Sequence, residues 1–123
     1  MTDLIELAEL AAEAAGDAET YDEMTADDLA SMSLALKSAA LTSGGLLRQR
    51  LGHDYERSRL QIARACDLPP KVLQRRVAEC ERAIAEDDLP TVPQHAAHCA
   101  FLMMHVAIVE AAIERKRLGA GLQ

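Results

Sequence analysis

Residues 94–109 read QHAAHCAFLMMHVAIV, a stretch without a single Asp, Glu, Lys or Arg. Between Ala96 and Val109, apolar residues fall on nearly every side of a helix drawn at 3.6 residues per turn. A helix that is apolar all round is usually buried all round. The sequence therefore predicts a long last helix over residues 94–118, placed at the centre of a helical bundle or at a subunit interface.

The remainder of the chain also has helical patterns and no strand-like alternation of useful length. We expect one all-α domain over residues 1–123, a compact bundle of four to five helices with a buried C-terminal helix. Ser43-Gly44-Gly45 leaves two alternatives open for the second helix, which is either long and kinked or divided into two. The other expected helices cover residues 3–15, which carry an acidic stripe, residues from Thr25 onward, 54–66 and 70–86.

The composition favours a soluble cytoplasmic protein that associates with itself. A core of Ala, Leu, Ile, Val and Met buries little area per residue, so we expect a homo-oligomer, a dimer through residues 94–118. The three cysteines are odd in number and lack CxxC spacing, which favours reduced thiols. The apolar run 96–109 is too short to cross a bilayer comfortably, and the acidic N-terminus does not resemble a signal peptide.

The net charge of −7 hides a strong asymmetry along the chain. Residues 1–44 hold ten acids and one base, which gives −9. Residues 45–82 hold nine bases and five acids, which gives +4, and residues 83–123 hold three bases and five acids, which gives −2. Because a polyanion is bound by a local face, the middle of the chain is the candidate nucleic-acid-binding region.

The stretch IARACDLPPKVLQRRVAE, residues 62–79, has the pattern of a helix-turn-helix, and the candidate unit covers residues 57–82. Ala63 is the small residue expected where the two helices cross, four residues before Asp67 in the turn. On the second helix, Lys71, Arg75 and Arg82 cluster on one side. The apolar residues expected in the core lie opposite them and are Leu73, Val77, Cys80 and Ile84.

LPPKVLQRRV resembles the recognition-helix segment of the arabinose-regulator (AraC-type) transcription factors. The resemblance covers about 20 residues and implies a helix that reads duplex DNA with Lys71, Gln74 and Arg75 facing outward. Arg suits guanine and Gln suits adenine, so Arg75 and Gln74 are the candidates for base contacts. The remaining candidate DNA-binding residues, expected mainly at phosphates, are Lys71, Arg57, Arg59 and Arg82. The alternative is an ordinary bundle helix whose charged face meets water.

A second motif, RQRLGHDY at residues 48–55, is similar to the Arg-x-x-x-x-His-x-Tyr motif of HEPN-type ribonucleases, including toxins of toxin–antitoxin pairs. The resemblance implies metal-independent RNA cleavage by Arg48 and His53 at a dimer interface, with Tyr55 as a companion residue. Arg can stabilise charge on a phosphorus centre, and His can move a proton near neutral pH. The alternative interpretation is a helix end with exposed Arg.

On the last helix, His95, His98 and Cys99 are the only candidate metal ligands within one turn of each other. No Gly-rich phosphate loop is present, and we expect no cofactor. The leading hypothesis is a small dimeric DNA-binding regulator without enzymatic activity. The rivals are a HEPN-like ribonuclease and a non-enzymatic helical module that binds other proteins.

Overall fold

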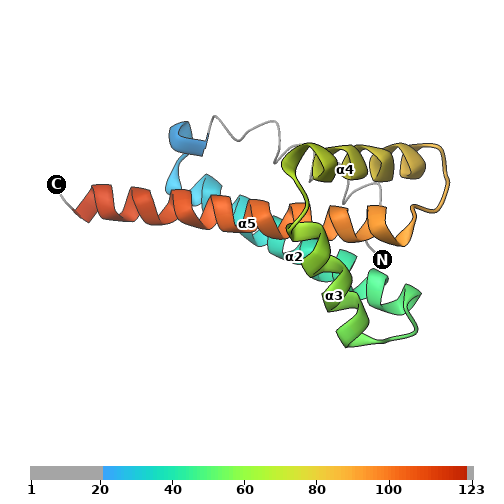
Figure 1. Ribbon diagram of the computed structural model, residues 1–123. Coiled ribbons are helices and arrows are strands. Elements are labelled where there is room, and N and C mark those ends of the chain that lie inside the picture. Colours follow the sequence, from blue (N-terminus) through green and yellow to red (C-terminus); the bar gives the residue numbers. More distant parts are fainter. Residues whose placement is uncertain (1–20, 122–123) are drawn as a thin grey trace.

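A computed structural model describes residues 21–121, so the expected acidic helix over residues 3–15 lies outside the described part. The described residues form helices and no strands, as the all-α prediction requires (Figure 1). A short 3-10 helix precedes four α-helices. In chain order these are η1 (Tyr21–Glu23), α2 (Ala26–Arg50), α3 (Tyr55–Cys66), α4 (Pro70–Ala85) and α5 (Val92–Gly121).

Helix α2 is one continuous helix of 25 residues that runs through Gly44 and Gly45. Its start follows from the sequence, since the Thr25 hydroxyl accepts a hydrogen bond from the Asp28 amide at 3.1 Å. The carboxylates of Asp27 and Asp28 in the first turn interact favourably with the positive end of the helix dipole. Of the two arrangements that the sequence left open, the long helix is therefore the one adopted.

The turn from α2 to α3 uses two consecutive residues in the left-handed region, Gly52 with φ 71° and His53 with φ 65°. Glycine adopts this conformation without cost, whereas a residue with a side chain rarely does. The His53 amide donates to the Arg48 carbonyl at 2.8 Å, which closes the end of α2. Asp54 then caps α3 by accepting from the Arg57 amide at 3.0 Å.

Helix α4 begins with Pro70 in its first turn, where a missing amide hydrogen costs nothing. Asp67 to Pro69 connect it to α3. The inner face of α4 is buried as its helical periodicity predicts, and it consists of Leu73, Val77, Cys80 and Ile84.

Helix α5 is longer than predicted, because it begins at Val92 and reaches Gly121 instead of covering 94–118. A reciprocal pair of hydrogen bonds explains the early start. The Gln94 amide donates to the Thr91 hydroxyl at 3.3 Å, and the Thr91 amide donates to the Gln94 side chain at 3.0 Å. Thr-x-x-Gln at residues 91–94 is thus a capping box, with Pro93 tolerated in the first turn.

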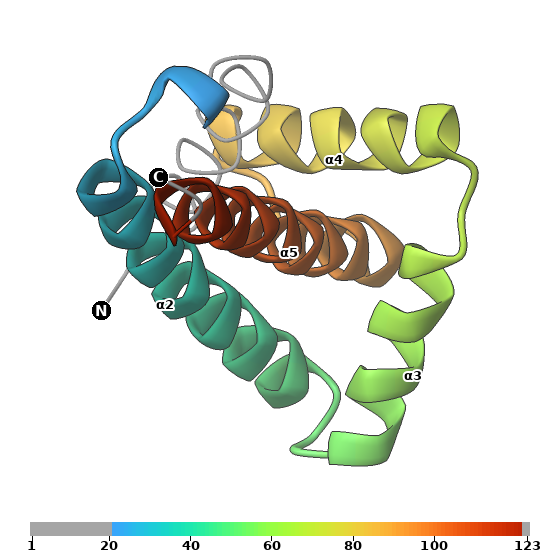
Figure 2. The same cartoon turned by 90° about the vertical axis from the view of Figure 1, so that its left-hand side faces the viewer.

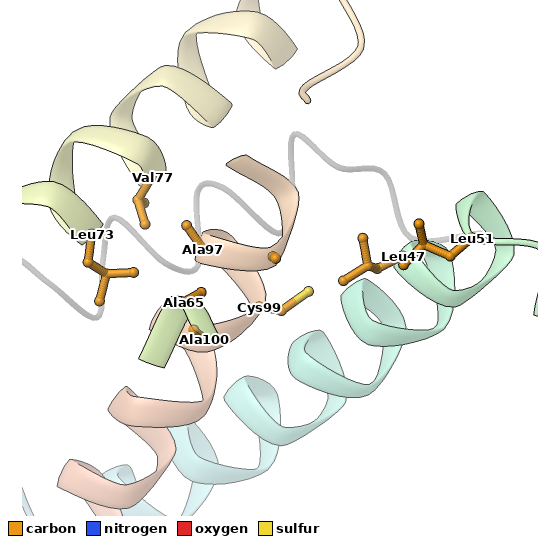
Figure 3. Packing of buried hydrophobic residues seen from close by; sticks show 9 residues of the cluster. Leu47, Leu51, Ala65, Leu73, Val77, Ala97, Cys99 and Ala100 are labelled. Atoms are coloured by element: carbon orange, nitrogen blue, oxygen red, sulfur yellow. The ribbon is translucent and has the colours of Figure 1, made fainter. Parts of the chain in front are cut away.

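The other three α-helices all pack against α5, and α3 and α4 barely touch one another (Figure 2). Two clusters form most of the core. One lies between α2 and the second half of α5 and includes Leu29, Leu36, Leu102 and Val109. The other joins the end of α2, α3 and α4 to the first half of α5, where Cys99 is directed toward α2 (Figure 3).

The two halves of α5 differ in burial, so within one chain only the first half has the central position that the sequence predicts, and the alternative, a subunit interface, stays a prediction for the second half. Residues 95–100 are all buried between α2, α3 and α4. The C-terminal part of α5 extends past α3 and α4 (Figure 1). Met103 still lines a hollow with residues of α3, and Met103, Met104 and Ile108 are 50%, 42% and 42% exposed. By length and composition, Val92–Gly119 also fits a membrane span, yet 56% of its most apolar window is buried inside the structure.

Candidate functional site

The outer face of α4 carries Lys71, Gln74, Arg75 and Arg82, all of them exposed. Lys71, Arg75 and Arg82 are four and seven residues apart, so they form one stripe about 16 Å long at 1.5 Å per residue. None of these three cations makes an ion pair with a residue of the described range 21–121. Ala78, also exposed, lies between Arg75 and Arg82, and no acid interrupts the stripe.

The acids of α4 lie at the sides of this basic stripe. Glu79 accepts a hydrogen bond from the Gln94 side chain of α5 at 3.1 Å, so its carboxylate is directed along the flank toward α5. Glu81 is partly buried, and this burial raises the pKa of its carboxyl group. The centre of the outer face of α4 is therefore cationic and polar.

The pair α3 and α4 departs from the predicted helix-turn-helix in one respect. Ala63, expected at the helix crossing, is exposed, and the buried small residue of α3 is Ala65. The reason is that α3 packs on α5 instead of crossing α4. Arg57 and Arg59 are exposed on α3, as phosphate contacts require.

The structure brings together only part of the ribonuclease-like motif. Arg48 from α2 and Tyr55 from α3 line one hollow of about 340 Å³, together with Arg59. His53 is exposed in the turn and is not among the residues that line this hollow.

A buried polar cluster surrounds His95 near the start of α5. Arg50 at the end of α2 donates through Nη2 to the Pro90 carbonyl at 2.6 Å, and its Nη1 lies 3.2 Å from His95 Nδ1. Because a guanidinium only donates, we assign the acceptor role to His95 Nδ1 and the proton to Nε2. Burial first, and then the positive charge of Arg50, lower the pKa of His95 to about 4.

Ser43, seven residues before Arg50 on the same face of α2, completes this buried cluster. Its Oγ lies 3.0 Å from the Cys99 sulfur and 3.5 Å from His98 Nδ1. Burial raises the pKa of the Cys99 thiol to about 11 and that of the Cys80 thiol to about 12. Neither thiol is therefore a thiolate at neutral pH, which is the form that attacks substrates or binds metals.

The candidate metal ligands His95, His98 and Cys99 do not form a metal site in this arrangement. Within residues 21–121 no group of three His, Cys, Asp or Glu side chains gathers in a geometry that holds a metal ion. His95 faces the Arg50 guanidinium, and that positive charge opposes a second cation. The cluster instead joins α2 to α5 through hydrogen bonds.

Ser43 and Arg50 are the members of this cluster that the sequence analysis missed. They are seven residues apart on α2, on the same side as Leu36 and Leu47. Two polar residues within an apolar stripe are a signal for a buried hydrogen-bond network, since buried polar groups need partners.

Comparison with family models, with curated proteins and with solved structures gives no match for this chain. The arrangement of its side chains is therefore the basis for any function. Three features stand out, namely the basic stripe of α4, the hollow between α2 and α3, and the buried cluster around His95.

Proposed function

We propose that the protein is a small DNA-binding regulator that contacts duplex DNA through the outer face of α4. One observation carries the proposal, which is the exposed stripe of Lys71, Arg75 and Arg82 without an ion pair in the described residues 21–121. Unpaired cations at a regular spacing suit the phosphates of a duplex. An ordinary solvated helix face more commonly mixes both signs of charge.

The dimensions of α4 suit the major groove. A helix is about 10–12 Å across with its side chains, and the groove is about 12 Å wide. Gln74 and Arg75 lie in the first half of α4, the half that contacts base edges in known recognition helices. We assign base contacts to these two residues and phosphate contacts to Lys71, Arg82, Arg57 and Arg59.

The proposed regulator is a soluble cytoplasmic homodimer that forms through α5. The exposed second half of α5, with Met104 and Ile108 at its surface, supports this dimer. Two copies of α4 about 34 Å apart would then reach two successive major grooves on one side of a duplex.

The test is salt-dependent binding to a fluorescently labelled duplex, measured by anisotropy. With about four phosphate contacts per copy, the logarithm of the affinity should fall with the logarithm of the salt concentration with a slope of about −3.6 per copy. The double variant Lys71→Ala/Arg75→Ala should weaken binding at least tenfold at 50 mM salt. It should reduce the steepness of that slope by about 1 per copy, because it removes one phosphate contact and one base contact.

The matched control is Lys37→Ala/Arg48→Ala, which removes two exposed positive charges from α2. This variant should bind nearly as well as the unchanged protein. Equal weakening by both double variants would mean that only net charge matters, and absence of binding at 50 mM salt would also refute the proposal.

The HEPN-like ribonuclease is the second candidate, supported by Arg48 and Tyr55 at one hollow and by the left-handed His53 beside them. It predicts RNA cleavage that persists in EDTA and disappears in His53→Ala. Cleavage that survives this substitution would exclude His53 as the proton donor. If DNA binding and cleavage are both absent, the third hypothesis, a protein-interaction module, takes their place.

A further inference from the structure

The hollow between α2 and α3 has the size and the lining of a small-molecule site. Its volume of about 340 Å³ falls at the lower end of the roughly 300–1,000 Å³ typical of ligand pockets. At the ~30 Å³ that one water occupies in the liquid, it holds about eleven non-hydrogen atoms, close to the size of a ten-carbon carboxylate. A third helix contributes Met103 of α5 to the wall.

Two glycines in the middle of α2 keep this hollow open. Gly44 and Gly45 line it, and a Cβ added at either position would meet no atom within 4 Å. Packing within the described residues 21–121 therefore does not require glycine here. Glycine inside a helix nevertheless costs about 1 kcal/mol relative to Ala, so the pair lowers stability and leaves space for something else.

The hollow has a cationic end and an apolar end. Arg48 and Tyr55 lie beside the α2–α3 turn, and Arg59 lies one helical turn further along α3. Leu41 on α2 and Ile62 on α3 each lie about two helical turns from the α2–α3 turn. Together with Met103 of α5 they form the apolar end of the hollow. Neither Arg48 nor Arg59 makes an ion pair with a described residue, and a guanidinium keeps its charge at any physiological pH.

We propose that this hollow binds a small apolar molecule that carries one acidic group, such as a medium-chain carboxylate. The carboxylate accepts hydrogen bonds from Arg48 and Arg59, and the hydrocarbon part covers Leu41, Ile62 and Met103. Charge complementarity favours this occupant over a neutral molecule of the same shape. The proposal does not depend on DNA binding. Arg59 is shared with the proposed phosphate contacts, but the hollow uses no residue of α4 and its ligand is measured without DNA.

The first experiment compares decanoate with decanol by isothermal titration calorimetry, below the micelle concentration of decanoate. Decanoate should bind saturably, one per chain, and at least fivefold more tightly than decanol. In the double variant Arg48→Gln/Arg59→Gln, decanoate and decanol should bind with equally low affinity. Arg57→Gln is the matched control, since Arg57 lies on α3 but outside this hollow, and it should keep the preference. Equal affinities for both ligands in the unchanged protein would overturn the proposal.

The second experiment fills the hollow. Gly44→Leu places a side chain into the open space, so the variant should unfold at a higher temperature and bind decanoate at least tenfold more weakly. Ser38→Leu, exposed on the same helix and outside the hollow, is the control and should keep the affinity. Unchanged binding in Gly44→Leu would place the carboxylate elsewhere and refute the site.

A second copy of the chain is the other possible occupant of the hollow, and sedimentation velocity tests for it by measuring the oligomeric state. If decanoate fails to bind while Gly44→Leu converts a dimer into a monomer, the hollow is a subunit contact and the proposal is wrong. A dimer that persists in Gly44→Leu, together with lost decanoate binding, is the expected result.

Discussion

Residues 96–109 of α5 contain no Asp, Glu, Lys or Arg, yet the first part of this stretch is enclosed and the second part is exposed on one side. From His95 to Leu102, α2, α3 and α4 enclose the helix, and Ala97, Ala100 and Leu102 are fully buried. In the second half, within residues 21–121, the buried residues of α5 cluster with residues of α2 and with Tyr21, and Met103, at the edge of α3, is 50% exposed.

Side-chain size accounts for this difference. Helices pack with their axes 8–10 Å apart, and the shorter distances require small side chains at the contact. The enclosed half supplies them with Ala96, Ala97, Cys99 and Ala100, whereas the open half presents Met and Ile. Residues 96–109 carry no charged side chain in either part, so charge does not separate the two environments, and the closely spaced small residues 96, 97, 99 and 100 mark the enclosed part.

The largest expected effect comes from truncating one leucine at the end of the enclosed half. Leu102→Ala should lower the free energy of unfolding by about 3 kcal/mol, because Leu102 is fully buried and its loss leaves a cavity. Ile108→Ala, at a position 42% exposed, should cost under about 1 kcal/mol. Urea unfolding followed by circular dichroism measures both. Equal losses would contradict the difference between the two halves.

The pH dependence of stability tests the enclosed half through His95. Since burial and Arg50 lower its pKa from 6.5 to about 4, the unfolded chain binds more protons than the folded one between these values. The free energy of unfolding should therefore decrease by about 3 kcal/mol as the pH falls from 6.5 to 4, and the loss should level off below pH 4.

His95→Asn is the informative variant, because its amide oxygen can replace Nδ1 as the acceptor for Arg50 but does not titrate. The pH-dependent loss should become smaller. It should not vanish, since burial also lowers the pKa of His105. An identical pH profile in urea titrations of both proteins would show that His95 does not cause it.

A smaller loss is expected when the connection between α2 and the start of α5 is removed. Arg50→Met eliminates the charged hydrogen bond to the Pro90 carbonyl and should cost about 2 kcal/mol. Arg48→Met is the control, because Arg48 is exposed and lies one half-turn before Arg50 on α2. This variant should change the free energy of unfolding by under about 0.5 kcal/mol. Thermal unfolding of the two variants side by side gives the comparison, and equal shifts would argue against the Arg50 contact.

The smallest effect is expected in the open half of α5. Met104→Gln should change the free energy of unfolding of the monomer by less than about 0.5 kcal/mol, because Met104 is 42% exposed within one chain. The measurement is chemical unfolding at a protein concentration at which the proposed dimer through α5 has dissociated. A loss above about 1.5 kcal/mol under these conditions would contradict the open surroundings of Met104.

Local patterns predicted the helices well, because caps and apolar spacing act within a few residues. Local sequence is enough to predict that α3 starts at Asp54. It is also enough to predict which face of α4 is buried. The Thr91–Gln94 capping box was also visible as a pattern and was missed because two prolines surround it. Ala63 was misplaced for another reason, since only tertiary packing decides that α3 lies on α5 and not on α4.

The candidate site was less predictable than the fold. Helical periodicity was sufficient to put Lys71, Arg75 and Arg82 on one face. It does not show that Arg48 and Arg59 meet Met103, because residues from three helices far apart in sequence make that hollow. The contacts of Ser43 and Arg50 with α5 span 45 to 56 residues, beyond the range of any local pattern.

The central position of α5 has a consequence for how the chain is made. Helices α2, α3 and α4 all precede their common packing partner in the sequence. At a synthesis rate of about 5–20 residues per second, roughly 4 to 14 s pass between completion of α2 and completion of α5. During that time three amphipathic segments leave the ribosome with nothing to pack against, so the nascent chain is a natural client for chaperones that shield apolar surface.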